Sequence, residues 1–245
     1  MKKRLDVLLV EKGIAASRTL AQALVMEGKV RVGGQVERKA SRQVEDGAAI
    51  EVEEPPRFVS RGGEKLEGAF AAFSGFDVTG KDCIDVGSST GGFTDCLLQH
   101  GAGFVMAVDV GTNQLAYKLR VDPRVWCREK YNARYMKRED LPRVPEVAVT
   151  DVSFISLRLI LPPIAEVLAP GGVIVALIKP QFEVGKGNAP GGLVRDEKLR
   201  LEARDGIVSF AREELALELL GLEVSPIKGK EMGNVEYLSF WRKPF

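Results

Sequence analysis

The most informative segment of the chain is Asp85-Val86-Gly87-Ser88-Ser89-Thr90-Gly91-Gly92-Phe93. A short segment, 81–84, precedes it and has the character of the end of a buried strand, whereas 94–99 has the character of a helix. Strand, glycine-rich turn and helix in this order form the nucleotide-cofactor site at the carboxyl end of a parallel strand. Glycines allow the backbone to approach a ligand where a Cβ atom would clash. The stretch therefore predicts an α/β fold with a ligand site at this turn.

Two departures from common motifs narrow the choice of ligand. No Lys-Ser/Thr pair follows the glycines, so a phosphate-cradling P-loop is not expected, and the spacing differs from the G-x-G-x-x-G of dinucleotide sites. A second predicted strand, 104–109, ends in Asp109, whose carboxylate can accept hydrogen bonds from a ribose diol. These features favour an adenosine ligand without a pyrophosphate, and S-adenosylmethionine is the leading candidate. The alternative is a turn that holds glycines for steric reasons alone.

Composition places the chain among ordinary globular proteins. Of its 245 residues, 45% are hydrophobic and 28% are charged. No window approaches 18 uninterrupted apolar residues, and charged residues interrupt the basic amino terminus, so we expect neither a transmembrane helix nor a secretory signal. Cys83, Cys96 and Cys127 are far apart and form no C-x-x-C pair, which predicts neither disulfides nor zinc, and we expect no metal. A cytoplasmic protein fits best.

The net charge of +1 conceals two basic regions. Residues 1–42 contain ten bases and four acids, and residues 118–143 contain nine bases and four acids. Two separated basic regions in a nearly neutral chain indicate a footprint for a polyanion. The alternative is that both are ordinary solvated faces.

The amino-terminal region predicts a compact module of two helices and a small β region. Apolar residues recur at helical spacing over 4–27, interrupted by Gly13, and Ser17 is a suitable N-cap for the second helix. The segments 30–36 and 48–52 have the pattern of short strands. Consecutive prolines at 55–56 then mark a domain boundary, because proline stiffens a connection and continues neither a strand nor a helix.

This module resembles the S4 family of RNA-binding domains. The resemblance rests on Arg4-Leu5-Asp6, on the segment 17–22 and on the segment 27–34. In that family the two helices and the following strand present basic residues to structured RNA, which is read through phosphates and shape. The resemblance implies RNA contacts by Arg4, Ser17, Arg18, Gln22, Lys29 and Arg31.

The rest of the chain predicts alternating strands and helices. A loop leads into a predicted helix from Leu66 to Phe73. Predicted strands lie near 83–86, 104–109, 124–128, 146–151 and 172–178; a helix over 196–220 follows, with final strands near 221–225 and 235–241.

Charged residues lie where the predicted strands end. Asp151 and Lys179 follow adjacent buried strands, and such carboxyl ends are where open α/β sheets bind ligands. Lys65 lies near a helix amino terminus, an unfavourable place for a cation, and Glu236 lies in an otherwise apolar strand. The alternatives are a structural salt bridge for the strand-end residues, a solvated lysine, and an edge-strand glutamate that faces water.

Five ordered blocks resemble the TlyA (hemolysin A) family, which joins an S4 domain to an FtsJ-type ribose 2′-O-methyltransferase. The blocks are 60–66, 85–94, 150–156, 178–183 and 233–237. The resemblance implies a Rossmann-like methyltransferase domain that uses S-adenosyl-L-methionine, preceded by a small α+β S4-like domain. It places the Lys-Asp-Lys-Glu tetrad of FtsJ-type enzymes on Lys65, Asp151, Lys179 and Glu236. It places cofactor contacts at Asp85, Gly87, Ser88, Gly91, Gly92 and Phe93, with Asp109 on the ribose and Asn132 near the adenine.

The resulting hypothesis is 2′-O-methylation of ribose, with cytidine as the best guess, in ribosomal RNA or a ribosomal subunit. Lys179 is assigned as the base, with Lys65, Asp151 and Glu236 as its positioning partners. We expect an S4-like domain over 1–54, a linker over 55–60 and a methyltransferase domain over 61–245. Two alternatives stay open, a membrane-active hemolysin and an RNA-binding assembly factor with an idle methyltransferase fold. The sequence leaves the oligomeric state open.

Overall fold

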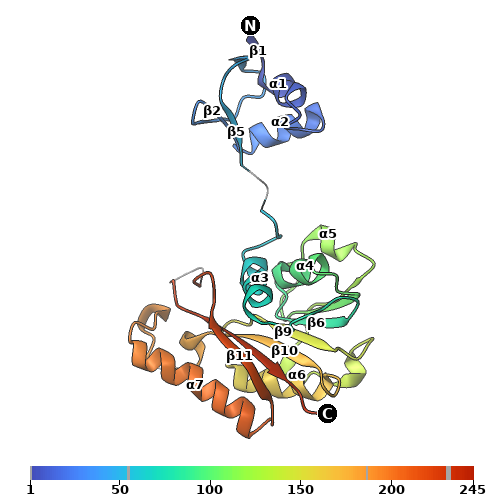
Figure 1. Cartoon of the computed structure of the whole chain (residues 1–245), viewed down its shortest axis with the longest axis vertical. Helices are drawn as coiled ribbons and strands as arrows, with labels where there is room; N and C mark the ends of the chain where they lie inside the picture. The colour runs from blue at the N-terminus through green and yellow to red at the C-terminus, as the bar shows by residue number, and fades with distance from the viewer. Residues whose placement is uncertain (1, 54–55, 186, 230–232) are drawn as a thin grey trace. The chain divides into compact units, whose positions relative to one another are not determined.

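The computed structural model describes residues 2–53, 56–185, 187–229 and 233–245. The chain divides into two compact units, residues 1–57 and 58–245 (Figure 1). Residues 54 and 55, where the predicted first domain ends and the predicted linker begins, lie outside the described residues.

The amino-terminal unit packs two helices against short strands. Its elements are β1 (Lys2–Arg4), α1 (Leu5–Glu11), α2 (Arg18–Met26), β2 (Val30–Val32), β3 (Gln35–Glu37), β4 (Gln43–Glu45) and β5 (Ile50–Val52). β3, β2 and β5 form one antiparallel sheet in that order, and β1 pairs with β4. Leu5, Leu8 and Leu9 of α1 are fully buried. The predicted N-cap is confirmed, because the hydroxyl of Ser17 accepts a hydrogen bond from the Leu20 N–H at 3.2 Å.

The second unit alternates strands and helices. Its strands are β6 (Asp82–Val86), β7 (Phe104–Val108), β8 (Val125–Arg128), β9 (Val147–Thr150), β10 (Val173–Ile178), β11 (Glu218–Val224) and β12 (Tyr237–Arg242). Its α-helices are α3 (Gly62–Ala72), α4 (Gly92–Gln99), α5 (Tyr117–Arg120), α6 (Leu161–Val167) and α7 (Glu197–Glu213). Short 3₁₀ turns are η1 (Ala133–Tyr135), η2 (Arg138–Asp140), η3 (Leu157–Leu159), η4 (Pro180–Phe182) and η5 (Pro190–Gly192).

One seven-stranded sheet organises this unit, in the order β11-β12-β10-β9-β6-β7-β8. The five strands from β10 to β8 are parallel, and β12 runs antiparallel to both β10 and β11. The chain leaves β6 toward β7 and β8, then crosses back to β9, so the strand order reverses beside β6. Open α/β sheets bind ligands at such a reversal, outside the carboxyl ends of the strands. The predicted Rossmann-like α/β class is confirmed.

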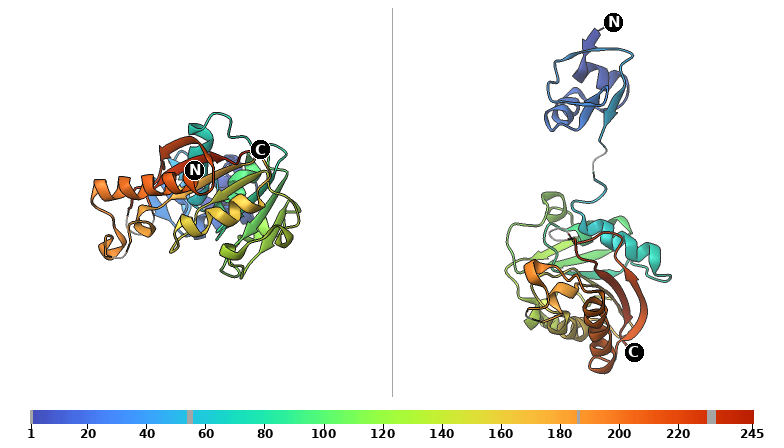
Figure 2. Two further views of the ribbon diagram at one scale, coloured as in Figure 1. Left: turned by 90° about the horizontal axis from the view of Figure 1, so that it is seen from below. Right: turned by 90° about the vertical axis from the view of Figure 1, so that its left-hand side faces the viewer.

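Side chains of alternate strand residues fill two cores, one on each face of the sheet. Cys83 of β6 packs in the core that α3 and α4 cover, through residues such as Leu66 and Leu97. The next residue, Ile84, packs in the core that α6 and α7 cover, through residues such as Ile164. The views in Figures 1 and 2 show the sheet between these helices. Because parallel strands are buried on both faces, the strand segments are apolar without alternation.

The predicted helix over 196–220 is wrong in its last third. α7 ends at Glu213, Ala216 adopts a left-handed φ of 53°, and the Leu217 N–H donates to the Ala211 carbonyl at 3.0 Å. Residues 218–224 then pair with β12 as an outer strand. The segment from Glu213 to Leu220 is rich in helix-forming Glu, Leu and Ala, so the strand exists because of its long-range pairing.

α3 begins at Gly62, four residues before the predicted start, because two glycines permit a close approach. A Cβ atom on Gly63 would lie 2.2 Å from Cγ of Phe58, whose side chain is buried against α3. A Cβ atom on Gly92 would lie 2.8 Å from the backbone nitrogen of Gly63. The amino termini of α3 and α4 therefore meet backbone to backbone, where only glycine fits.

We expect Gly63→Ala to lower the free energy of unfolding by about 1–3 kcal/mol, because the added methyl group overlaps the Phe58 ring and forces repacking. Gly62→Ala is the matched control in the same turn, since its Cβ atom would meet neighbours no closer than 3.5 Å. Urea denaturation of both variants measures the difference. Equal stability of the two variants would contradict the packing argument.

Candidate functional site

Four charged side chains from four separate elements meet at the carboxyl edge of the sheet. Lys65 comes from the first turns of α3, Asp151 follows β9, and Lys179 follows β10. β9 and β10 are parallel neighbours, so their ends lie side by side. β12 runs antiparallel to β10 with Ile178 opposite Tyr237, and this register brings Glu236 to the same place. Sheet topology therefore assembles residues that are up to 171 positions apart in sequence.

The carboxylate of Asp151 bridges the two lysines. Its Oδ1 lies 2.5 Å from Nζ of Lys179, and its Oδ2 lies 3.3 Å from Nζ of Lys65. Nζ of Lys65 also lies 2.7 Å from Oε2 of Glu236. Lys65, Lys179 and Glu236 are all buried, at 8%, 7% and 2% exposure. Two cations and two anions neutralise one another, which is the condition for holding this much charge out of water.

Further polar residues that the sequence prediction missed hold this cluster in place. Nζ of Lys179 donates to the Ser153 hydroxyl at 2.8 Å, and the Gln181 amide donates to Oε1 of Glu236 at 3.4 Å. Asn234 accepts from the Val194 N–H and donates to the Gly192 carbonyl, so it fastens a neighbouring loop. All three lie in or beside the conspicuous sequence blocks, but hydroxyl and amide side chains are too common there to single out.

A cavity of about 660 Å³ joins this cluster to the glycine-rich turn. Its lining includes all four charged residues and, from the turn, Asp85, Gly87, Ser88, Ser89, Thr90, Gly92 and Phe93. Gly87 has a left-handed φ of 83°, and a Cβ atom there would lie 2.9 Å from Cγ1 of Val152. The predicted cofactor residue Gly91 does not line the cavity; a Cβ atom there would lie 2.3 Å from the Leu119 side chain.

Asp85 is a buried acid at the floor of this cavity. Its Oδ2 accepts hydrogen bonds from the N–H and the hydroxyl of Thr94, at 2.9 and 2.7 Å. Its Oδ1 has no hydrogen-bond partner among the described residues. Burial raises the pKa of Asp85 to about 7, although both Thr94 hydrogen bonds oppose the rise. An unpartnered acceptor beside an open cavity is a position that a ligand can fill.

The two remaining predicted cofactor residues, Asp109 and Asn132, do not line the cavity. Asp109 follows β7 and accepts from the Ser89 N–H at 2.8 Å and from the Gly111 N–H at 2.6 Å, so it braces the turn. Asn132 is exposed and caps η1 by accepting from the Arg134 N–H. Their contacts with a cofactor stay predictions.

In the amino-terminal unit, the buried carboxylate of Asp6 organises three of the predicted RNA-binding residues. Its oxygens accept from Arg4 at 3.0 and 2.9 Å, from Arg18 at 3.0 Å and from Gln22 at 2.8 Å. Asp6 is 0% exposed, whereas the side chains of Arg4 and Arg18 are 40% and 56% exposed. The hydrogen bond from Arg4 is the largest cause that holds the pKa of Asp6 well below its usual range.

The other predicted RNA-binding residues, outside this network, are at or near the surface of the same unit. Ser17 caps α2, Nζ of Lys29 pairs with Glu27, and Arg31 donates to the Gly34 carbonyl.

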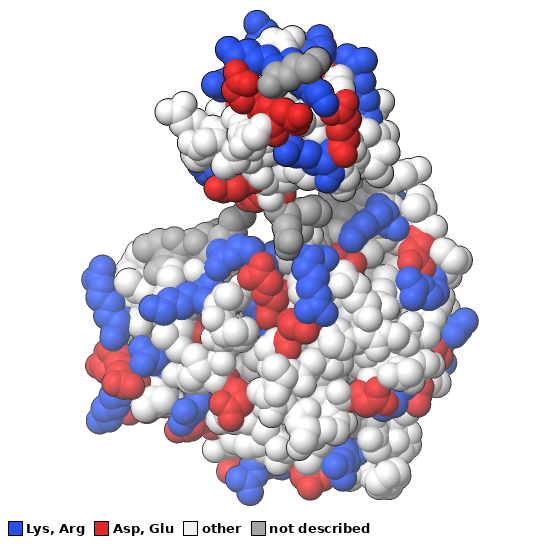
Figure 3. All heavy atoms as spheres, turned by 45° about the horizontal axis from the view of Figure 1, so that its top comes forward, with Lys and Arg blue, Asp and Glu red and all other residues white. Residues whose placement is uncertain are grey.

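The second basic region is largely neutralised within the protein. Six of its bases form ion pairs with nearby carboxylates: Lys118, Arg120, Arg124, Arg128, Lys137 and Arg143. On the face shown in Figure 3, Lys and Arg side chains are likewise interspersed with Asp and Glu. These pairs favour the solvated-face interpretation for 118–143.

The mouth of the cavity carries exposed aromatic and basic groups. Phe154 is 82% exposed, adopts a left-handed φ of 62°, and has its ring centroid 5.3 Å from that of Phe182. Arg61 donates to the Lys228 carbonyl at 3.2 Å, and both basic residues line the cavity. A non-glycine residue with a left-handed φ carries backbone strain, and strained residues of this kind are common at functional sites.

Comparisons with known proteins agree with this geometry. The profile of FtsJ-like methyltransferases matches residues 58–243, and the profile of S4 domains matches residues 3–50. The chain is 43% identical to the 16S/23S rRNA (cytidine-2′-O)-methyltransferase TlyA of Mycobacterium tuberculosis, over 98% of this chain and 90% of that protein. It is 44% identical to Hemolysin A of Brachyspira hyodysenteriae, over 96% and 98% of the two chains. A solved structure from Streptococcus thermophilus has 44% identity and a TM-score of 0.75, covering 99% of this chain and 89% of that one.

A membrane-spanning helix is not found among the described residues, since none of their helices is both long and apolar enough.

The raised pKa of Asp85 predicts a loss of stability as pH rises. The folded protein keeps this proton up to about pH 7, whereas the unfolded chain releases it near pH 4, so stability falls across that window. Asp85→Asn cannot titrate there. We expect the free energy of unfolding of the wild type, minus that of Asp85→Asn, to fall by about 2–4 kcal/mol between pH 4 and pH 7. Urea unfolding without added ligand measures it, and parallel pH profiles would contradict the assignment.

Proposed function

The chain belongs to the TlyA family of FtsJ-like methyltransferases that carry an S4 domain, and from this premise we propose that it methylates a ribose 2′-hydroxyl of cytidine in ribosomal RNA. The observation that carries the proposal is the buried cluster of Lys65, Asp151, Lys179 and Glu236, which opens into the same cavity as the glycine-rich turn. The cluster supplies proton-transfer groups, and the turn supplies a place for the methyl donor beside them.

The residues at the turn fit S-adenosyl-L-methionine, the methyl donor of this enzyme class. A cavity of about 660 Å³ is within the range that holds a ligand of this size. Gly87 and Gly92 present bare backbone to it, and Asp85 offers an unpartnered carboxylate oxygen. We propose that Asp85, Gly87, Ser88, Gly92 and Phe93 hold the cofactor, with Gly91 and Asp109 shaping the turn and Asn132 near the adenine. When bound, the cofactor supplies an activated methyl group on a sulfonium.

In the proposed mechanism, the cluster positions the 2′-hydroxyl and removes its proton. A ribose hydroxyl is a weak nucleophile, so its oxygen must lose its proton as it attacks the methyl carbon. We assign Nζ of Lys179 as the acceptor of that proton, which it takes as the neutral amine after its ammonium form has released one proton to solvent. Asp151 fixes the position of Nζ from one side, and the Ser153 hydroxyl fixes it from another. Lys65, held by Glu236, orients the hydroxyl. Its oxygen is then aligned with the methyl carbon before the reaction, so the enzyme does not depend on a random encounter of the two groups.

The surroundings of the cavity fit an RNA substrate. The Phe154 and Phe182 rings at its mouth offer a face on which a base can stack, and Arg61 and Lys228 offer charges for the phosphates on either side. The exposed arginines around Asp6 offer a second, separate contact with structured RNA. A substrate of this kind, in a ribosomal subunit, supports the proposal of a cytoplasmic enzyme.

We expect Lys179→Ala to lower the rate of methyl transfer to ribosomal RNA by about 10²–10⁴-fold, because the proton acceptor is lost. Cofactor affinity should stay near that of the wild type, since the proposed cofactor contacts come from the turn. The assays are transfer of labelled methyl groups to separated ribosomal RNAs and calorimetric titration with the cofactor.

Lys198→Ala, at an exposed position on α7, is the matched control and should retain full activity. Methyl transfer by Lys179→Ala at the wild-type rate would overturn the assignment of the base. Mapping of the modified nucleotide in the wild-type reaction tests the proposed cytidine 2′-hydroxyl.

A second prediction concerns Asp6. Asp6→Asn removes a negative charge, so charge alone would strengthen binding to RNA. We expect the opposite, a loss of affinity of about tenfold, because Arg4 and Arg18 lose their fixed positions and binding must then immobilise them at about 0.5–1.5 kcal/mol each. Fluorescence anisotropy with labelled ribosomal RNA, over a series of salt concentrations, measures the affinity.

Asp46→Asn is the control, because it makes the same charge change at an exposed site that contacts none of these arginines. It should bind at least as tightly as the wild type. Circular dichroism checks that both variants fold. If Asp6→Asn binds as tightly as Asp46→Asn, the positioning argument fails.

A further inference from the structure

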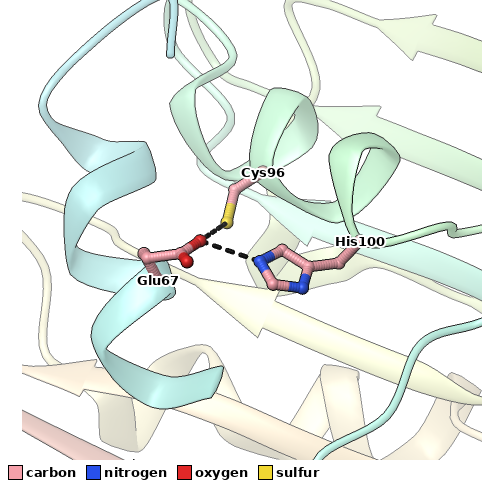
Figure 4. Close-up of side chains that lie close together, drawn as sticks. All are labelled: Glu67, Cys96 and His100. Atoms are coloured by element: carbon pink, nitrogen blue, oxygen red, sulfur yellow. Dashed lines mark hydrogen bonds and ion pairs between the residues drawn. The ribbon is translucent and has the colours of Figure 1, made fainter. Parts of the chain in front are cut away.

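A second group of chemically reactive side chains lies away from the active site, between α3 and α4. Glu67 projects from α3, Cys96 projects from α4, and His100 is the residue that caps the end of α4, four positions after Cys96 (Figure 4). Oε2 of Glu67 lies 2.8 Å from Nε2 of His100 and 3.8 Å from Sγ of Cys96. Cys96 is fully buried, whereas the side chains of Glu67 and His100 are 33% and 27% exposed.

From this group we infer that Glu67, Cys96 and His100 form a binding site for a divalent transition metal of the zinc type. One ligand atom from each residue lies within 4.8 Å of the other two. Tetrahedral zinc with bonds of about 2.0–2.3 Å separates its ligand atoms by about 3.3–3.6 Å. The observed separations from Oε2 of Glu67, 2.8 Å to His100 and 3.8 Å to Cys96, lie on either side of this ligand-to-ligand distance. Small rotations of the side chains therefore bring all three ligand atoms to bonding distance from one metal ion. A water molecule completes the fourth position on the exposed side.

The chemistry of the three ligands favours this class of metal. A thiolate, an imidazole and a carboxylate are the groups that zinc takes in proteins, whereas magnesium and calcium prefer oxygen ligands alone. On binding, the Cys96 thiol releases its proton to solvent, and a metal–sulfur bond replaces the S–H bond. The thiolate and the Glu67 carboxylate then neutralise the two positive charges of the ion, so the partly buried site carries no net charge.

The surroundings orient the ligands in advance. His100 follows the last residue of α4, and its N–H donates to the Cys96 carbonyl at 3.0 Å as in a helical turn. Residues four positions apart in such a turn face the same way, so Cys96 and His100 lie on one side. The His100 ring stacks on Phe70 of α3, with centroids 3.7 Å apart and planes within 6°, so its orientation is fixed. The cysteine spacing predicted no zinc site, because Glu67 lies 29 residues before Cys96 and reaches it only through the packing of α3 on α4.

The site has a structural consequence for the catalytic unit. Glu67 lies two residues after Lys65 on α3, and α4 begins in the glycine-rich turn at Gly92. A metal at this site ties together the two helices that carry Lys65 and the cofactor turn. Binding to the folded state alone raises its stability by mass action.

The test is titration of the reduced full-length protein, freed of metal by chelation, with Co²⁺ and then Zn²⁺. Co²⁺ bound through Cys96 should give a near-ultraviolet thiolate-to-cobalt charge-transfer band at one equivalent, which Zn²⁺ abolishes. Zn²⁺ at a hundred times its dissociation constant should raise the melting temperature by about 5–10 °C. Cys96→Ser should lose the band, whereas Cys127→Ser should keep it.

Glu67→Gln and His100→Gln alter partly exposed ligands, so they test the site even if Cys96→Ser fails to fold. Both should weaken Co²⁺ binding at least tenfold. The absence of a band in the wild type, or wild-type binding by both of these variants, would overturn the inference. Neither result depends on methyl transfer, so the proposed function is tested separately.

Discussion

The bridge that the Asp151 carboxylate makes between two buried lysines is the interaction on which the proposed active site depends. Lys65 and Lys179 come from a helix and a strand end, and one carboxylate holds both. Removing water from two ammonium groups is costly, and it is tolerable here because Asp151 and Glu236 neutralise them. The neutral cluster can therefore lie deep in a cavity, where hydrogen bonds and charges act on a substrate with little competition from water.

Sheet topology explains how distant residues reach this bridge. β9 and β10 are parallel neighbours that end together, and β12 returns antiparallel beside β10, so Glu236 arrives at the same edge. Lys65 comes from α3, whose amino terminus packs closely because Gly92 of α4 leaves room for its backbone and Gly63 leaves room for the Phe58 ring. The glycines of the turn thus have two functions. Gly87 and Gly92 line the cavity, and Gly92 also allows α4 to pack closely against α3.

In the amino-terminal unit, too, a carboxylate holds cationic side chains in fixed positions. Asp6 is a fully buried carboxylate surrounded by Arg4, Arg18 and Gln22. In the proposed active site, the half-buried Asp151 and the buried Glu236 hold lysines inside a cavity; here a buried acid holds arginines at the surface. In both cases the acid reduces the freedom of a long cationic side chain before a ligand arrives, which lowers the entropy cost of binding.

The α/β class, the glycine-rich turn and the charged strand ends could all be predicted before the structure was known, because strand and helix patterns and turn chemistry are local and appear within a few residues. The blocks around Lys65, Asp151, Lys179 and Glu236 also identified the four residues that the structure brings together. The structure was needed to show which of them touch, why Gly63 must be glycine, and that 218–224 is a strand despite its helix-forming residues. It alone joined Glu67 to Cys96 and His100, and Asp6 to its arginines. Each of these depends on contacts between segments far apart in the chain, and such contacts leave no periodic signal in the sequence.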